Sequence, residues 1–171
     1  MIAIPPEYIE SCVYLYATKD DAKNGERLGG SGLTVGVRFE KNISHYQNYI
    51  LTCWHLLRKF RNPTIRINLR AGGFECFETN IDRWTRHPDG DDIAVHPLDL
   101  EQEKFGFYSV LTSSFVDEKA KEKPIWCGDE VFMPGRFTSQ EGTVSNKPSL
   151  RFGNIAMMPG EPVLAADEGV D

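Results

Sequence analysis

The chain has 171 residues, 40% of them hydrophobic and 26% charged, which is the composition of a globular domain and excludes wholesale disorder. Its formal net charge of −6 gives no electrostatic attraction toward nucleic acid or an anionic membrane, so we expect neither as a partner. Because no apolar run approaches the roughly 20 residues that span a bilayer, and no secretory signal opens the chain, the sequence predicts a cytoplasmic protein.

The first part of the chain alternates apolar and polar side chains in short runs that are typical of β-strands. A half-buried strand is predicted over 9–18 and a polar loop over 19–27. The clearest period-two strand runs over 33–40, directly after Gly29-Gly30-Ser31-Gly32. Further strands are predicted over 49–53, 65–69, 74–77, 81–87 and 92–95, with one or two helical turns over 56–60.

The pattern weakens after residue 100 and then resumes. Residues 101–123 form a charge-rich connection, and strands are predicted over 129–133, 142–145 and 150–155. The last residues, 165–171, carry no core pattern. Turn signals recur at intervals of roughly 8 to 12 residues in the first part, which favours a small antiparallel barrel over a sandwich.

The cysteines give no reason to expect a metal or a disulfide. Cys12, Cys53, Cys76 and Cys127 form no CxxC pair, and in a reducing compartment we expect four buried thiols. The interval in Cys53-Trp54-His55 is too short for the usual pair of zinc ligands. The sequence therefore predicts no metal site and no cofactor.

The chemistry is expected at a histidine and an aspartate that each adjoin a strand. His55 follows the apolar strand 49–53, where its backbone is held rigidly, and histidine is the side chain whose ordinary pKa best suits a general base near neutral pH. Asp92 opens the apolar run Ile93-Ala94-Val95. A buried carboxylate that accepts the Nδ1–H of a histidine fixes its tautomer, so we interpret Asp92 as the orienter of His55.

A local cluster of positive charge has a simpler interpretation than nucleic-acid binding. Aromatic side chains do not alternate with these basic residues, as they do in sites that bind single strands. The cluster is therefore expected to be a solvated strand face. It consists of Arg58, Lys59, Arg61, Arg66 and Arg70.

Four segments, in the correct order, resemble those of trypsin-like serine peptidases. Leu51-Thr52-Cys53-Trp54-His55 resembles the small-residue-rich segment that ends in the catalytic histidine, and Asp92-Ile93-Ala94-Val95 resembles the segment of the catalytic aspartate. Gly30-Ser31-Gly32-Leu33 is similar to the strand that often precedes that histidine. The run from Gly128 to Gly135 resembles the opening of the second barrel.

This resemblance implies an all-β, chymotrypsin-like antiparallel β-barrel fold, with the first barrel complete and the second partial. The first, six-stranded barrel would occupy 1–105 and carry His55 and Asp92, 106–127 would connect the barrels, and 128–171 would begin the second. The implied reaction is peptide-bond hydrolysis through an acyl-enzyme, with a protein or peptide as substrate. His55 would act as base and then acid, and the resemblance assigns no oligomeric state.

The nucleophile of that reaction is missing from the sequence. None of the serines that follow Asp92 lies in a Gly-x-Ser-Gly segment, Ser31 precedes the histidine, and Cys127 comes before the first strand of the second barrel. A truncated peptidase and a protease-like domain without catalysis are both compatible with this, and the acidic end favours truncation. We expect no turnover by these residues alone. The alternative is a non-catalytic module that binds an extended peptide at a strand edge.

Overall fold

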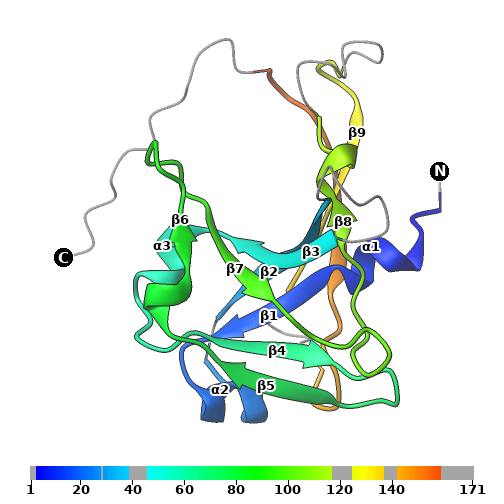
Figure 1. Ribbon diagram of the computed structural model, residues 1–171. Helices are drawn as coiled ribbons and strands as arrows, with labels where there is room; N and C mark the ends of the chain where they lie inside the picture. Colours follow the sequence, from blue (N-terminus) through cyan, green and yellow to red (C-terminus); the bar gives the residue numbers. More distant parts are fainter. Residues whose placement is uncertain (1–2, 28, 39–45, 117–124, 137–141, 159–171) are drawn as a thin grey trace. The chain divides into compact units, whose positions relative to one another are not determined.

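The structure is a computed structural model that describes residues 3–27, 29–38, 46–116, 125–136 and 142–158. Its elements are short, and strands outnumber helices among the described residues (Figure 1). In chain order they are α1 (Pro6–Glu10), β1 (Cys12–Tyr16), α2 (Lys19–Asn24), β2 (Gly30–Arg38), β3 (Tyr46–Thr52), α3 (Trp54–Leu57), β4 (Thr64–Asn68), β5 (Phe74–Glu78), the 3-10 helix η1 (Ile81–Arg83), β6 (Thr85–Arg86), β7 (Ala94–Leu98), β8 (Val110–Leu111), the 3-10 helix η2 (Thr112–Ser114), β9 (Glu130–Gly135) and β10 (Ser149–Asn154).

One curled sheet contains most of the strands. Its order is β5-β4-β1-β2-β3-β7-β6, all neighbours in this order are antiparallel, and β8 adds to β2 as a parallel strand. The two strands at the ends of this order, β5 and β6, follow each other in the chain through η1 (Figure 1). The sheet therefore bends back toward itself, as a barrel does, and the predicted all-β antiparallel fold is confirmed.

Strand β1 is buried on both of its faces, whereas the sequence predicted a half-buried strand over 9–18. Val13 and Leu15 point into the main apolar core, and Tyr14 and Tyr16 into a second cluster with Ala22 of α2. The outer face is covered because α2 packs there and the guanidinium of Arg136 lies over both tyrosine rings. The main core consists of Val13, Leu15, Ile50, Leu57, Ile65, Ile67, Trp84, Ala94, Leu98, Phe105 and Phe107.

Helix α2 occupies residues that were predicted to form a polar loop. Thr18 caps its N-terminus, since the hydroxyl oxygen accepts the backbone N–H of Asp21 at 3.1 Å and the hydroxyl donates to the Asp21 carboxylate at 2.6 Å. Asp20 and Asp21 in the first turn also complement the positive end of the helix dipole. These capping interactions outweigh a sequence with little apolar periodicity.

The strand predicted over 142–145 is absent from the described residues 142–148. Gly142 has φ +73°, and a Cβ there would lie 2.2 Å from the carbonyl oxygen of Ser145, so the chain turns at this point. The segment then runs beside β4, where Arg66 donates to the Gly142 carbonyl at 2.7 Å. The prediction of a single strand over 81–87 is also wrong in its first half. The 3-10 helix η1 forms there, and the strand β6 comprises only Thr85–Arg86.

Two expectations about burial are wrong. Arg66, assigned to a solvated strand face, is completely buried in β4 and lies over the ring of Phe74. Among the thiols, Cys12 is buried, Cys76 is half-buried, and Cys53 and Cys127 are exposed. Strand alternation assigned Arg66 to the outside, but α2 and the segment that begins at Gly142 cover that face.

The chain divides into two compact units. One comprises 1–115 and 134–150, and the other comprises 116–133 and 151–171. Strands β9 and β10 pair as a separate two-stranded sheet. The domain boundaries predicted at 105 and 128 stay predictions. None of the helices among the described residues has both the length and the apolar character needed to span a bilayer.

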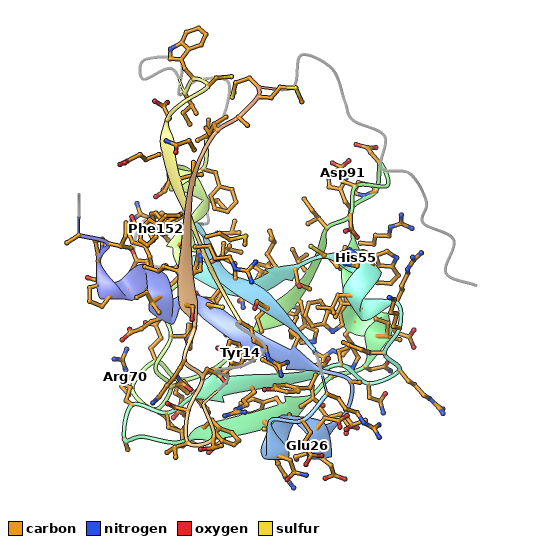
Figure 2. The ribbon with its side chains drawn as sticks, turned by 180° about the vertical axis from the view of Figure 1, so that it is seen from behind. Tyr14, Glu26, His55, Arg70, Asp91 and Phe152 are labelled. Atoms are coloured by element: carbon orange, nitrogen blue, oxygen red, sulfur yellow. The ribbon has the colours of Figure 1, made fainter. Side chains whose placement is uncertain are left out.

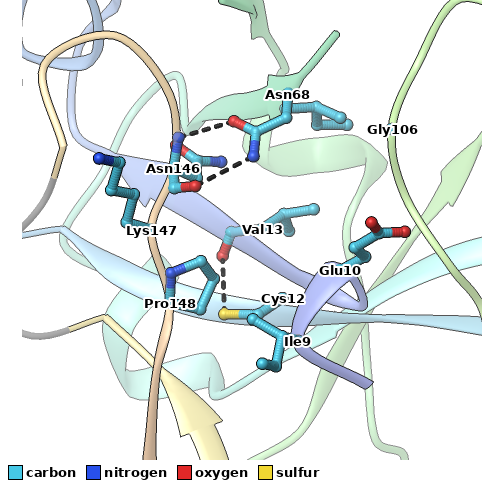
Figure 3. Close-up of a pocket in the computed structure, with 10 residues that line it drawn as sticks. Ile9, Glu10, Cys12, Val13, Asn68, Gly106, Asn146, Lys147 and Pro148 are labelled. Carbon is cyan, nitrogen blue, oxygen red and sulfur yellow. Dashed lines mark hydrogen bonds between the residues drawn. The ribbon is translucent and has the colours of Figure 1, made fainter. Parts of the chain in front are cut away.

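A pocket of about 300 Å³ lies between α1, β4 and the segment around Asn146 (Figure 3). Its wall is closed by two hydrogen bonds: the Asn68 side-chain amide donates to the Asn146 carbonyl at 3.0 Å and accepts the Asn146 backbone N–H at 2.6 Å. Asn146 in turn donates through Nδ2 to the Arg66 carbonyl at 2.7 Å. These asparagines hold residues 142–148 against β4.

Asn68→Ala is expected to lower the free energy of unfolding by about 2 to 3 kcal/mol, because it leaves the backbone N–H and carbonyl of a buried residue without partners. Urea denaturation of the chain measures the loss. Asn62→Ala is the matched control: Asn62 is exposed and its amide donates to the Glu78 carboxylate at 3.3 Å, so we expect a change within about 0.5 kcal/mol. Equal losses in the two variants would show that Asn68 does not hold the segment.

Candidate active site

His55 is placed by the transition from β3 to α3. Cys53 is extended, with φ −77° and ψ 134°, and serves as the N-cap of the four-residue helix in which His55 is the second residue. Leu57 at the end of this helix is completely buried in the main core and anchors it. Leu56 lies so close to β2 that a Cβ on Gly30 would meet its Cδ2 at 2.2 Å. The first glycine of Gly30-Ser31-Gly32 thus makes room for the histidine-bearing helix.

Asp92 is placed by the pairing of β7 with β3. The register sets Ala94 opposite Thr52, so the residues just before β7 lie beside those just after β3. Three hydrogen bonds join the two segments. The Asp92 carbonyl accepts the backbone N–H of Trp54 at 3.3 Å, and Oδ1 of Asp92 accepts the backbone N–H of His55 at 2.7 Å. The third joins Nδ1 of His55 and Oδ2 of Asp92.

The structure thus brings together the two predicted site residues, which are 37 positions apart in the chain. Figure 2 shows His55 on the short helix α3 and Asp91 on the loop that leads to β7. Asp91 pairs with another histidine, His87, at 3.6 Å between Oδ2 and Nδ1. His87 and Asp91 thus form a second His–Asp pair with a longer separation, and variants of this pair can serve as controls for variants of His55 and Asp92.

The carboxylate of Asp92 is held in its charged form. Desolvation by burial would raise its pKa, but the hydrogen bonds from the ring and the backbone N–H of His55, together with the charges of His55 and Arg58, lower it below the ordinary value. The pair is open to solvent, with 59% of the His55 side chain and 49% of the Asp92 side chain exposed. The sequence analysis assumed a buried carboxylate, and here it is half-exposed.

This arrangement can support general-base chemistry. A carboxylate opposite Nδ1 favours the tautomer that carries its proton there, which leaves the lone pair of Nε2 available to accept a proton. The same carboxylate stabilises the imidazolium that forms when it does. The geometry therefore has the parts of a base and its orienter.

Ser31 lies between two glycines, as a nucleophilic serine often does, but its contacts are structural. The hydroxyl oxygen of Ser31 accepts the backbone N–H of Arg136 at 2.8 Å, and its carbonyl accepts the hydroxyl of Thr52 at 2.9 Å. Ser31 thus links β2 to the segment after β9 and to the end of β3.

Cys53, for which the sequence predicted no role in the site, lies beside the His55–Asp92 pair. Its Sγ lies with a ring nitrogen of His55 and a carboxylate oxygen of Asp92, all three within 4.8 Å of one another. Desolvation by burial and the charge of Asp92 raise the pKa of its thiol. The short spacing of Cys53 and His55 was visible in the sequence, whereas the approach of Asp92 depended on the register of β7 against β3.

Comparison with known proteins places the fold. No model of a known protein family matches the chain, and no curated protein matches its sequence. The curled antiparallel sheet and the second sheet nevertheless define a chymotrypsin-like, protease-like all-β fold.

A solved structure with that fold is the MamO protease domain from Magnetospirillum magneticum in its apo form. The sequences are 17% identical, the TM-score is 0.54, and the match covers 94% of this chain and 67% of that one. At this identity the likeness shows the fold alone, because one fold carries many functions.

Proposed function

We propose that the chain is the His–Asp portion of a trypsin-like serine endopeptidase. The observation that supports this most directly is the hydrogen bond between Nδ1 of His55 and Oδ2 of Asp92 within a chymotrypsin-like fold. In the proposed reaction, Nε2 of His55 takes the proton of a nucleophilic serine as that serine attacks the peptide carbonyl. His55 then returns the proton to the leaving amine, and an acyl-enzyme forms.

The nucleophile in this proposal belongs to a longer form of the protein. The serines after Asp92 in the printed sequence lack the Gly-x-Ser-Gly setting whose backbone N–H groups stabilise the oxyanion. The substrate class is an extended peptide or protein. Asp92 acts through His55, as a positioning residue.

A second candidate is a non-catalytic module of the same fold that binds an extended peptide along a strand edge. The exposure of Asp92 favours it, because an orienting carboxylate works best when it is shielded from water. The two candidates differ in whether the complete gene product contains an activated serine.

Labelling with a serine-reactive fluorophosphonate distinguishes them. We expect the product of the complete gene to be labelled, and His55→Ala to reduce the rate of labelling by about 10³-fold or more, because the serine loses its base. His87→Ala is the matched control, since His87 pairs with Asp91 in the same region, and it should be labelled at the normal rate. A folded complete product that takes no label would favour the binding module.

A further inference from the structure

The thiol beside the His–Asp pair gives that pair a second possible use. Cys53, His55 and Asp92 offer one sulfur, one nitrogen and one oxygen donor within 4.8 Å of one another. All three residues are exposed, so an ion in solution can reach them. Zinc binds donors of each of these three types.

The three donors lie within 4.8 Å of one another, which is the length scale of a zinc site. Three ligands of one tetrahedral zinc ion lie about 3.3 to 3.6 Å apart, given metal–ligand bonds of about 2.0 to 2.3 Å. The backbone around the three residues is already fixed, because Asp92 accepts the backbone N–H groups of both Trp54 and His55. Binding of the ion would replace the hydrogen bond between Nδ1 of His55 and Oδ2 of Asp92.

We propose that Cys53, His55 and Asp92 bind a zinc ion, with a water molecule in the fourth position. The Cys53 thiol releases its proton to solvent and binds as thiolate. The neutral imidazole of His55 binds through Nδ1 and carries its proton on Nε2, and Asp92 binds through a carboxylate oxygen. One proton leaves for each ion that enters, and no redox step is involved.

The sequence analysis expected no metal because the Cys53–His55 spacing is too short for the usual ligand pair. The third donor comes from Asp92, which the pairing of β3 with β7 brings to the same place. Cys53 also occupies a segment in which the resemblance led us to expect small residues. Because the side chain of Cys53 is exposed, packing in the core does not explain a cysteine at this position, whereas metal binding does.

Zinc at this site would inhibit the proposed peptidase. The ion takes the Nδ1 position that otherwise faces Asp92, and it moves the proton of the ring to Nε2, which then has no lone pair for a serine proton. This consequence depends on the proposed function, whereas the binding of zinc depends only on the three side chains.

Titration of the 171-residue chain with Co²⁺, followed by displacement with Zn²⁺, tests the binding. We expect one equivalent of Co²⁺ to produce a thiolate-to-metal charge-transfer band and the visible absorption of a tetrahedral site, both lost when Zn²⁺ is added. Cys53→Ser should abolish the charge-transfer band and weaken Zn²⁺ binding at least about tenfold. His55→Gln and Asp92→Asn should each weaken it too.

Two variants serve as matched controls. Cys127→Ser removes another exposed thiol, and His87→Gln removes the histidine of the neighbouring His–Asp pair. Both should keep the band and the affinity. A charge-transfer band that survives Cys53→Ser, or the absence of saturable one-to-one binding, would overturn the site. If Co²⁺ binds as expected while the complete product takes no fluorophosphonate, the metal site stands and the peptidase proposal fails.

Discussion

Asp92→Asn is expected to lower kcat for peptide hydrolysis by about 10⁴-fold in the product of the complete gene. The amide of asparagine can present its NH₂ group to Nδ1 of His55, which favours the tautomer with the proton on Nε2. That tautomer has no lone pair to accept the proton of the nucleophilic serine. The loss should appear mainly in kcat, because Asp92 contacts the histidine that moves the proton in the proposed chemical step.

The matched control is Asp91→Asn. Asp91 is the adjacent residue, is also exposed, and lies 3.6 Å from the ring of His87 instead of His55. We expect the kcat of this variant to stay within about twofold of the wild-type value, because surface substitutions away from the reacting groups usually have small effects. Comparable losses in the two variants would contradict a specific role for Asp92.

Arg66→Ala is expected to lower the free energy of unfolding by about 3 to 5 kcal/mol. The guanidinium is fully buried and donates to the hydroxyl of Tyr16 at 3.2 Å and to the carbonyls of Ala22 at 3.3 Å and Gly142 at 2.7 Å. It also lies 3.7 Å from the ring centroid of Phe74. Alanine leaves a cavity and three acceptors without their donor. Urea denaturation measures the loss.

Two further variants separate the causes of that loss. Arg66→Met fills most of the volume without donating hydrogen bonds, so we expect it to remain about 2 kcal/mol less stable than the wild type. Arg70→Ala removes an exposed arginine that bonds through Nε to the Gln102 carbonyl, and it should cost less than about 1 kcal/mol. An Arg66→Ala variant as stable as Arg70→Ala would contradict the structural role of this side chain.

The sequence was most informative where strand patterning and turn chemistry agree. The alternation after Gly32 and the apolar run before His55 predicted β2 and β3, and Ile50 of β3 is buried in the main core. The order of the histidine and aspartate segments predicted that these two residues would meet. The register of β3 against β7 then produces that meeting in the structure.

Several features that the sequence did not predict depend on contacts between distant segments. Arg66 alternates as an outward residue of β4, and nothing local indicates that Gly142 and α2 enclose it. The exposure of Asp92 and its closeness to the Cys53 thiol likewise follow from the geometry of two chain turns. Helix α2 was the exception, because Thr18 and Asp21 gave a capping signal that could have been recognised.

The tautomer of His55 in the metal-free chain tests the central claim most directly. Nitrogen-15 NMR of the histidine ring, assigned with His55→Gln and recorded at alkaline pH where imidazole is neutral, distinguishes the two ring nitrogens. The account predicts a protonated Nδ1 and an unprotonated Nε2, with this preference lost in Asp92→Asn and kept in Asp91→Asn. A ring with its proton on Nε2 in the wild type would contradict the assignment of Asp92 as its orienter.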